Sequence, residues 1–227
     1  VTVGVGEATF ASMDAFLDPG DEILVPNPVW LNYIHVPSAL GAVPVTYSLK
    51  EENDYQIDFE EMESKITDKT KMIVVVNPSN PTGGVFSRET LEKLSEIAIK
   101  HDLLVIADEI YSQLVYDGTE HVSIASLPGM KERTITLGGF AKAYSMTGWR
   151  LGYLCAPVGI IQACVRVHQY TVTCASSFVQ EAALTALSDC AEDVEAMRKE
   201  YQRRKDYVVK ALNEIDGISC NNPHGAL

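Results

Sequence analysis

Lys142 is the residue of this sequence best suited to covalent chemistry. It follows the apolar run 134–137. A lysine among apolar groups loses ammonium solvation, so its pKa falls and its amine becomes the nucleophile that a Schiff base requires. An isolated lysine is more often a solvated surface residue, but Arg150 follows eight positions later. Because arginine binds phosphate through paired hydrogen bonds, we interpret these residues as a candidate amine and a candidate phosphate ligand.

A second polar group follows the apolar run 72–76. The segment 77–84 reads NPSNPTGG and places the side-chain amide of Asn80 between two prolines. Asparagine, proline and glycine form turns in many proteins, so an ordinary turn is the alternative interpretation. If 72–76 is a strand of a parallel sheet, Asn80 lies beyond its carboxyl end, where such sheets bind ligands.

A buried acid is predicted after the apolar run 103–107. Asp108 ends this run, where an unpaired carboxylate would be costly, so it requires a cationic partner or a hydrogen-bond donor. The protonated nitrogen of a pyridine ring would serve, and Tyr111 could reach a phenolate oxygen on the same ring. A helix N-cap followed by an incidental tyrosine is the alternative.

The sequence VGVGE at residues 3–7 is a candidate phosphate loop. Glycine allows close approach of a ligand to the backbone, and a helix start offers unpaired N–H groups to a phosphate. We therefore select Val5, Gly6 and Glu7 as candidate phosphate-binding residues. The same glycines partly match the dinucleotide-binding fingerprint, but Thr9 stands where that pattern has a third glycine or alanine.

Trp30 begins a predicted helix after the apolar run 23–25, where its indole could stack on a flat ring; a core position is the alternative.

The candidates together comprise an amine, a phosphate cradle, an acid for a ring nitrogen, donors for a ring oxygen and a stacking surface. This combination describes a binding site for pyridoxal 5′-phosphate. No metal site is predicted.

The sequence resembles the large domain of the class I and II aminotransferases of fold type I, the aspartate-aminotransferase-like family. The resemblance covers essentially all 227 residues. It is carried by the NPTG turn at 80–83, by Asp108-x-x-Tyr111, and by Lys142-(x7)-Arg150 with MTGW at 146–149.

The resemblance implies a role for each candidate. Lys142 would form the Schiff base with the cofactor and move the substrate proton, and Asp108 would pair with the pyridinium nitrogen. Asn80 and Tyr111 would bind the ring 3-oxygen, and Trp30 would stack on the ring.

Val5, Gly6 and Glu7 would bind the cofactor phosphate together with Arg150. Many relatives have a serine three residues before the lysine, where this sequence has Gly139.

The activity implied is transfer of an amino group between an amino acid and a 2-oxo acid by a homodimer. The donor amino acid is not indicated. A carbon–sulfur lyase of the same fold and a pyridoxal-phosphate-sensing domain of a regulator are the alternatives. The motif Pro28-x-Trp30-x-x-Tyr33 favours the aminotransferase. The arginine that binds the substrate carboxylate in this family would lie beyond residue 227, so this chain alone is expected to hold cofactor without turnover.

Composition narrows the possible partners and compartment. A formal net charge of −13 argues against nucleic acid and anionic membranes as partners. The five cysteines are odd in number and lack a C-x-x-C pair, which predicts free thiols and a cytoplasmic location. No apolar stretch approaches the roughly 20 residues that span a bilayer.

Alternation of apolar runs with helical patterns predicts an α/β fold with three layers, α/β/α, around a mostly parallel seven-stranded sheet. We expect residues 1–188 to form the cofactor-binding large domain. Residues 189–227 are expected to form a long connecting helix and the start of a small domain, with a further strand at 217–220. The seven sheet strands are predicted at 2–5, 23–25, 43–47, 72–76, 103–107, 134–137 and 151–155.

Overall fold

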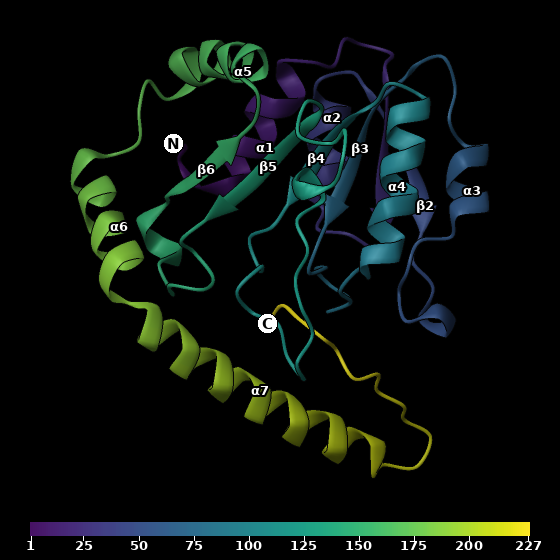
Figure 1. Cartoon of the computed structure of the whole chain (residues 1–227), viewed down its shortest axis with the longest axis vertical. Helices are drawn as coiled ribbons and strands as arrows, with labels where there is room; N and C mark the ends of the chain where they lie inside the picture. The colour runs from purple at the N-terminus through teal and green to yellow at the C-terminus, as the bar shows by residue number, and fades with distance from the viewer.

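The computed structural model describes residues 1–227 in full. At its centre is a six-stranded sheet with the strand order β2-β1-β3-β4-β5-β6 (Figure 1). Neighbouring strands are parallel, except that β6 pairs antiparallel with β5 at one edge. The strands are β1 (Glu22–Asn27), β2 (Val43–Ser48), β3 (Thr70–Val76), β4 (Leu104–Asp108), β5 (Thr134–Gly139) and β6 (Gly152–Cys155).

Strand β3 illustrates why the central strands are apolar throughout. Ile73 and Val75 belong to the apolar cluster on one face of the sheet, whereas Met72, Val74 and Val76 belong to the cluster on the other face. Successive side chains of a strand point to opposite faces, so a strand covered on both sides has no position for a solvated group. The strand predicted at 72–76 therefore forms, and it is buried on both faces.

Helices cover both faces of the sheet, which confirms the predicted three-layer α/β/α arrangement (Figure 1). α1, α2 and α5 pack on one face, and α3 and α4 pack on the other. The helices are α1 (Gly4–Asp14), α2 (Asn32–Ala39), α3 (Phe59–Ser64), α4 (Arg88–Lys100), α5 (Val158–Thr171), α6 (Ser177–Asp189) and α7 (Ala191–Asn213). Short 3₁₀ turns lie at Glu51–Asn53, Ile124–Ser126 and Thr147–Trp149.

Two predicted strands do not form. At the N-terminus, Thr2 makes a single antiparallel bridge with Gly152, and Gly4 then turns the chain into α1 with a φ of +75°. The segment 2–5 is therefore too short for a ladder, and the sheet has six strands instead of the predicted seven. Residues 217–220 are also without strand structure.

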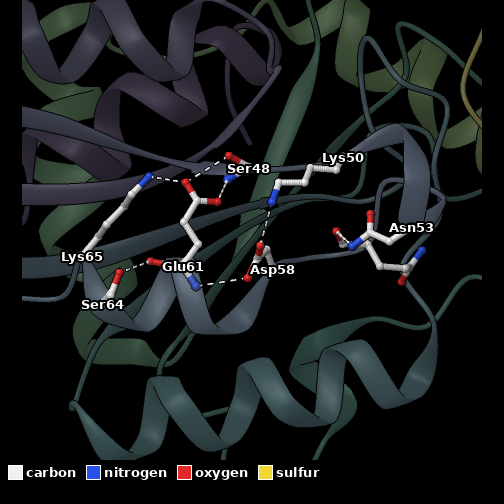
Figure 2. Close-up of polar contacts among 8 residues, drawn as sticks. Ser48, Lys50, Asn53, Asp58, Glu61, Ser64 and Lys65 are labelled. Atoms are coloured by element: carbon white, nitrogen blue, oxygen red, sulfur yellow. Dashed lines mark hydrogen bonds and ion pairs between the residues drawn. The ribbon is translucent and has the colours of Figure 1, made fainter.

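A polar network attaches the short helix α3 to the edge strand β2 (Figure 2). Asp58 caps the helix by accepting a hydrogen bond from the backbone N–H of Glu61 at 3.1 Å. The carboxylate of Glu61 accepts hydrogen bonds from the backbone N–H and the hydroxyl of Ser48, each at 3.0 Å, and pairs with Lys65. A helix of this length is not stable in isolation, so these contacts hold it on the sheet.

The chain leaves the sheet through α6 and α7, and its last residues return to it (Figure 1). α7 is the longest helix, at 23 residues, and Val194 is its only buried residue. In the returning segment, the backbone N–H groups of His224 and Gly225 both donate to the carbonyl of Gly83 at 2.9 Å. A Cβ atom on Gly83 would lie 2.4 Å from Cβ of Pro223, so this contact depends on glycine.

The helices and the cysteines bear on whether the chain has membrane-spanning segments or disulfide bonds. None of the helices combines the length and the hydropathy that crossing a membrane would require. All five cysteines are free, as predicted from their odd number and spacing.

Candidate active site

The strands β3, β4 and β5 end side by side and carry the predicted site residues at one edge of the sheet. Val76, Asp108 and Leu137 are register partners across the three strands. Because the strands are parallel, the segments that follow them leave the sheet on the same side. Asn80 and Lys142 lie in two of these segments, which explains how residues 62 positions apart in sequence come to one place.

A cavity of about 200 Å³ opens at this edge. Eight of the nine residues selected from the sequence line it, and the exception is Glu7. The lining residues are Gly4, Val5, Gly6, Trp30, Val76, Asn80, Asp108, Ile110, Tyr111, Ala141, Lys142, Thr147 and Arg150.

Asp108 is a buried carboxylate with two neutral hydrogen-bond donors. Its Oδ2 accepts from the Tyr33 hydroxyl at 2.6 Å, and its Oδ1 accepts from the backbone N–H of Ile110 at 3.1 Å. Burial raises the pKa of the Asp108 carboxyl, and the nearby charge of Glu109 adds to this; the two hydrogen bonds and the charge of Lys142 oppose it. A cationic donor within the cavity would therefore stabilise the ionised form of Asp108.

Lys142 follows β5 in a tight turn that aims its amine into the cavity. Its Nζ lies 5.3 Å from the centroid of the Tyr111 ring, within the range of a cation–π contact. The turn is closed by hydrogen bonds from the Ser145 N–H to the Lys142 carbonyl at 3.0 Å and from the Met146 N–H to the Phe140 carbonyl at 3.2 Å. Phe140 and Met146 are buried in an apolar cluster, which anchors the turn on both sides of the lysine.

Arg150 lies against the N-terminus of α1 and forms a cationic cradle with it. A Cβ atom on Gly4 would lie 2.8 Å from Nη2 of Arg150, so the guanidinium packs directly on the glycine backbone. Arg150 itself has a φ of +52°, a conformation that costs a non-glycine residue free energy and marks a constrained position. The helix start adds the N–H groups and partial positive charge at Val5 and Gly6.

Substituting Gly4 with alanine tests this cradle. We expect Gly4→Ala to lower the free energy of unfolding by about 1–2 kcal/mol because its φ is positive, and to weaken binding of the cofactor by about tenfold because Cβ displaces Arg150. Gly118→Ala is the matched control, since Gly118 has a φ of +74° with open space around it. Chemical denaturation and titration with pyridoxal 5′-phosphate would measure both effects. Equal cofactor affinities in the two variants would contradict a role of Gly4 in the cradle.

The surroundings of Glu7 and Gly139 bear on the phosphate site implied by the resemblance. The Glu7 carboxylate accepts a hydrogen bond from the Val3 N–H at 2.9 Å and lies 3.0 Å from Nδ1 of His168 on α5. It therefore fastens the start of α1 to α5 and does not face the cavity. At Gly139, a Cβ atom would lie 3.0 Å from the carbonyl oxygen of Leu151, so a serine would require the backbone to shift.

Several residues of the site were not selected from the sequence. Ile110 lines the cavity between Asp108 and Tyr111, and Thr147, which belongs to the MTGW motif, lines it next to Arg150. Tyr33 donates to Asp108 across 75 positions of sequence, a separation at which local patterns carry no information. Its place three residues after Trp30, in a motif already noted, was the one available indication.

A larger cavity of about 520 Å³ lies between α7 and the C-terminal segment. Its lysine, Lys205, is held by the carboxylates of Asp117 and Asp206 at 2.5 and 3.0 Å. The larger cavity thus lacks an unengaged amine beside a buried acid. We therefore place the candidate active site in the smaller cavity.

The residues of the smaller cavity fit pyridoxal 5′-phosphate. Asp108 is buried and has only neutral hydrogen-bond donors, so a protonated ring nitrogen would supply the missing cationic donor. The cradle of Arg150 and the α1 N-terminus suits a phosphate. Lys142 supplies the amine at the same cavity.

Comparison with known proteins identifies the family. The model of the family "Aminotransferase class I and II" matches residues 1–227. The chain belongs to this family. It is 45% identical to the putative aminotransferase YugH of Bacillus subtilis and 44% identical to the aspartate aminotransferase of Musicola paradisiaca, covering 100% of this chain in each case. It superposes on 61% of the crystal structure of an aromatic aminotransferase from Pyrococcus horikoshii, covering 99% of this chain with a TM-score of 0.96 and 42% identity.

The aminotransferase relatives are longer than this chain. It spans 58% of the Bacillus subtilis protein and 57% of the Musicola paradisiaca protein. The match with the solved aminotransferases over nearly the whole chain confirms the α/β fold expected from the resemblance.

Proposed function

We propose that this chain forms the cofactor-binding part of a pyridoxal-phosphate-dependent aminotransferase, which moves an amino group between an amino acid and a 2-oxo acid through a Schiff base on Lys142. The observation that carries the proposal is the single cavity that brings Lys142 together with the buried carboxylate of Asp108 and the guanidinium of Arg150. An amine, an acid and a phosphate ligand at these positions match the three reactive parts of the cofactor.

When bound, the cofactor supplies an aldehyde that condenses with amines and a ring that accepts electrons from a bond broken at the substrate Cα. The protein would position side chains of suitable charge around the cofactor. Lys142 places an amine at the cavity and would be the base that moves the Cα proton. Asp108 would present its carboxylate to the ring nitrogen, and Trp30 would offer its indole as a stacking surface.

The remaining lining residues would fix the cofactor's position. The Asn80 amide and the Tyr111 hydroxyl are the donors for the ring 3-oxygen. Arg150 and the backbone N–H groups of Val5 and Gly6 would bind the phosphate. Because the Glu7 carboxylate is engaged by Val3 and His168, its side chain has no direct part in this proposal.

The names of the relatives favour transamination over elimination, since they include aspartate and aromatic-amino-acid aminotransferases. We propose aspartate with 2-oxoglutarate as the first substrate pair to test. The full-length protein should produce glutamate and oxaloacetate from this pair. Pyruvate and ammonia from cystathionine, without transamination, would instead identify a carbon–sulfur lyase. Cofactor binding without turnover of any amino acid would favour a sensing domain.

We also propose the domain division and the assembly. Residues 1–188 would be the large domain, and residues 189–227 the connecting helix and the start of a small domain. A homodimer is supported by large apolar side chains exposed on α5 and α6, among them Tyr170, Phe178 and Leu184. Light scattering of the full-length protein should give twice the mass of one chain. The free thiols are consistent with a reducing, cytoplasmic environment.

A further inference from the structure

Tyr33 is buried beneath the cavity and makes the one side-chain hydrogen bond to Asp108. Its side chain is fully buried, and its hydroxyl donates to Oδ2 of Asp108 at 2.6 Å. Tyr33 does not line the cavity, so it is placed to act through Asp108 and not on a ligand.

The proton of this hydrogen bond remains on Tyr33. Burial raises the pKa of the Tyr33 hydroxyl well above its usual range, and the negative charge of Asp108 raises it further. The neighbouring Thr9 hydroxyl acts in the opposite direction and lowers the pKa of Tyr33. This hydroxyl is buried and forms no hydrogen bond of good geometry. Tyr33 is therefore a permanent donor, and Asp108 is the partner that can change charge.

We propose that Tyr33 is a positioning residue that keeps Asp108 ionised and fixes the orientation of its carboxylate toward the cavity. With Oδ2 held by Tyr33 and Oδ1 held by the Ile110 N–H, the carboxylate cannot rotate without breaking a hydrogen bond. Its remaining lone pairs then face the cavity that Asp108 lines. The inference rests on the proposed function for its consequence, since the group that Asp108 would pair with is the ring nitrogen of the cofactor.

The other charged or titratable groups around Asp108 do not replace this donor. Glu109 is its chain neighbour and disfavours ionisation, whereas the charge of Lys142 favours it without forming a hydrogen bond to it. Tyr111 and Arg150 line the same cavity, but neither donates to the Asp108 carboxylate. Removing the Tyr33 hydroxyl would leave one buried carboxylate oxygen without a protein donor.

The sign of the pH dependence follows from the direction of the Asp108 shift. The carboxyl has a pKa raised above its ordinary value of 3.8, mainly by burial, so the folded protein holds this proton more tightly than the unfolded chain. Asp108 therefore stabilises the fold at low pH and loses that contribution as the pH rises through its folded-state pKa. The Tyr33 hydrogen bond lowers the pKa of the Asp108 carboxyl in the folded protein. Tyr33→Phe removes this hydrogen bond, so the pKa rises further and the stability lost with increasing pH becomes larger.

The experiment compares Tyr33→Phe with Tyr47→Phe in the full-length protein without cofactor. Tyr47 is equally buried, and its hydroxyl donates to a neutral group, the Val74 carbonyl, at 2.7 Å. We expect the denaturant midpoint of Tyr33→Phe to fall further below the wild-type midpoint as the pH rises from about 5 to about 8, and that of Tyr47→Phe to fall by a constant amount. In the Asp108→Asn background, the effect of Tyr33→Phe should lose its pH dependence.

Binding of pyridoxal 5′-phosphate provides a second measurement. Tyr33→Phe should weaken the affinity by roughly tenfold to a hundredfold at neutral pH, as expected for loss of a hydrogen bond to a charged group, and Tyr47→Phe should leave it unchanged. A midpoint shift of Tyr33→Phe that is constant with pH, or an unchanged affinity, would overturn the positioning role. If the wild-type protein binds no cofactor, the proposed function fails, while the pH-dependent midpoints still decide whether Tyr33 controls Asp108.

A folding failure of Tyr33→Phe is also decisive. If this variant does not fold at neutral pH, addition of Asp108→Asn should restore folding, because it removes the buried charge that has lost its donor. Failure of the double variant to fold, while Tyr47→Phe folds, would show that the Tyr33 hydroxyl is needed for folding independently of the Asp108 charge and would overturn the inference.

Discussion

Lys142→Ala should reduce the turnover number of the full-length enzyme by at least about 10⁴-fold, because the variant loses both the condensing amine and the base for the Cα proton. The fold should persist. Lys142 is only half-buried, and the buried side chains that hold its turn, Phe140 and Met146, are unchanged. Steady-state kinetics with aspartate and 2-oxoglutarate would measure the loss.

Lys142→Arg is the matched variant for charge. It keeps a cation over the Tyr111 ring, but a guanidinium stays protonated and does not condense with an aldehyde. We expect it to be as inactive as Lys142→Ala. Substantial turnover in Lys142→Arg would show that the residue serves only as a charge, and another amine would then have to carry the chemistry.

Asp108→Asn should lower the turnover number by about 10²–10³-fold, the usual cost of removing one preorganised electrostatic partner from an active site. The carboxamide has nearly the same shape and retains an acceptor for Tyr33, but it cannot neutralise a protonated ring nitrogen. The loss should appear in the turnover number measured at saturating cofactor, so that weaker cofactor binding does not account for it.

Glu109→Gln is the control for Asp108→Asn. It removes a carboxylate from the next position in the chain, and this carboxylate lies 3.3 Å from Nε2 of His121 and not in the cavity. We expect its turnover to stay within about threefold of wild type, as for a change outside the reacting groups. Comparable losses in the two variants would indicate a general effect of negative charge in this region.

Much of the site could be predicted because its residues follow apolar strands. In a parallel sheet the strand ends coincide, so Asn80, Asp108 and Lys142 were expected to meet even though their separations in sequence are large. Helix α4 is also explained by local sequence: its buried apolar positions recur at helical spacing, and Ser87 caps its first turn.

The parts that were missed depend on backbone conformation or on contacts between distant residues. The start of α1 is set by the positive φ of Gly4, which a run of alternating glycine and valine does not distinguish from a strand. The Glu7–His168 contact spans 161 positions, so nothing in the sequence indicates that the Glu7 side chain contacts α5. Residues 217–220, predicted as a strand, form none; the C-terminal segment instead bonds to Gly83 through the backbone N–H groups of His224 and Gly225.

The attachment of the cofactor to Lys142 is tested most directly by borohydride reduction of the full-length protein saturated with pyridoxal 5′-phosphate, followed by peptide mass mapping. If Lys142 carries the cofactor, reduction should fix one phosphopyridoxyl group on the peptide containing Lys142 and on no other. Modification of a different lysine, or of none, would contradict the account.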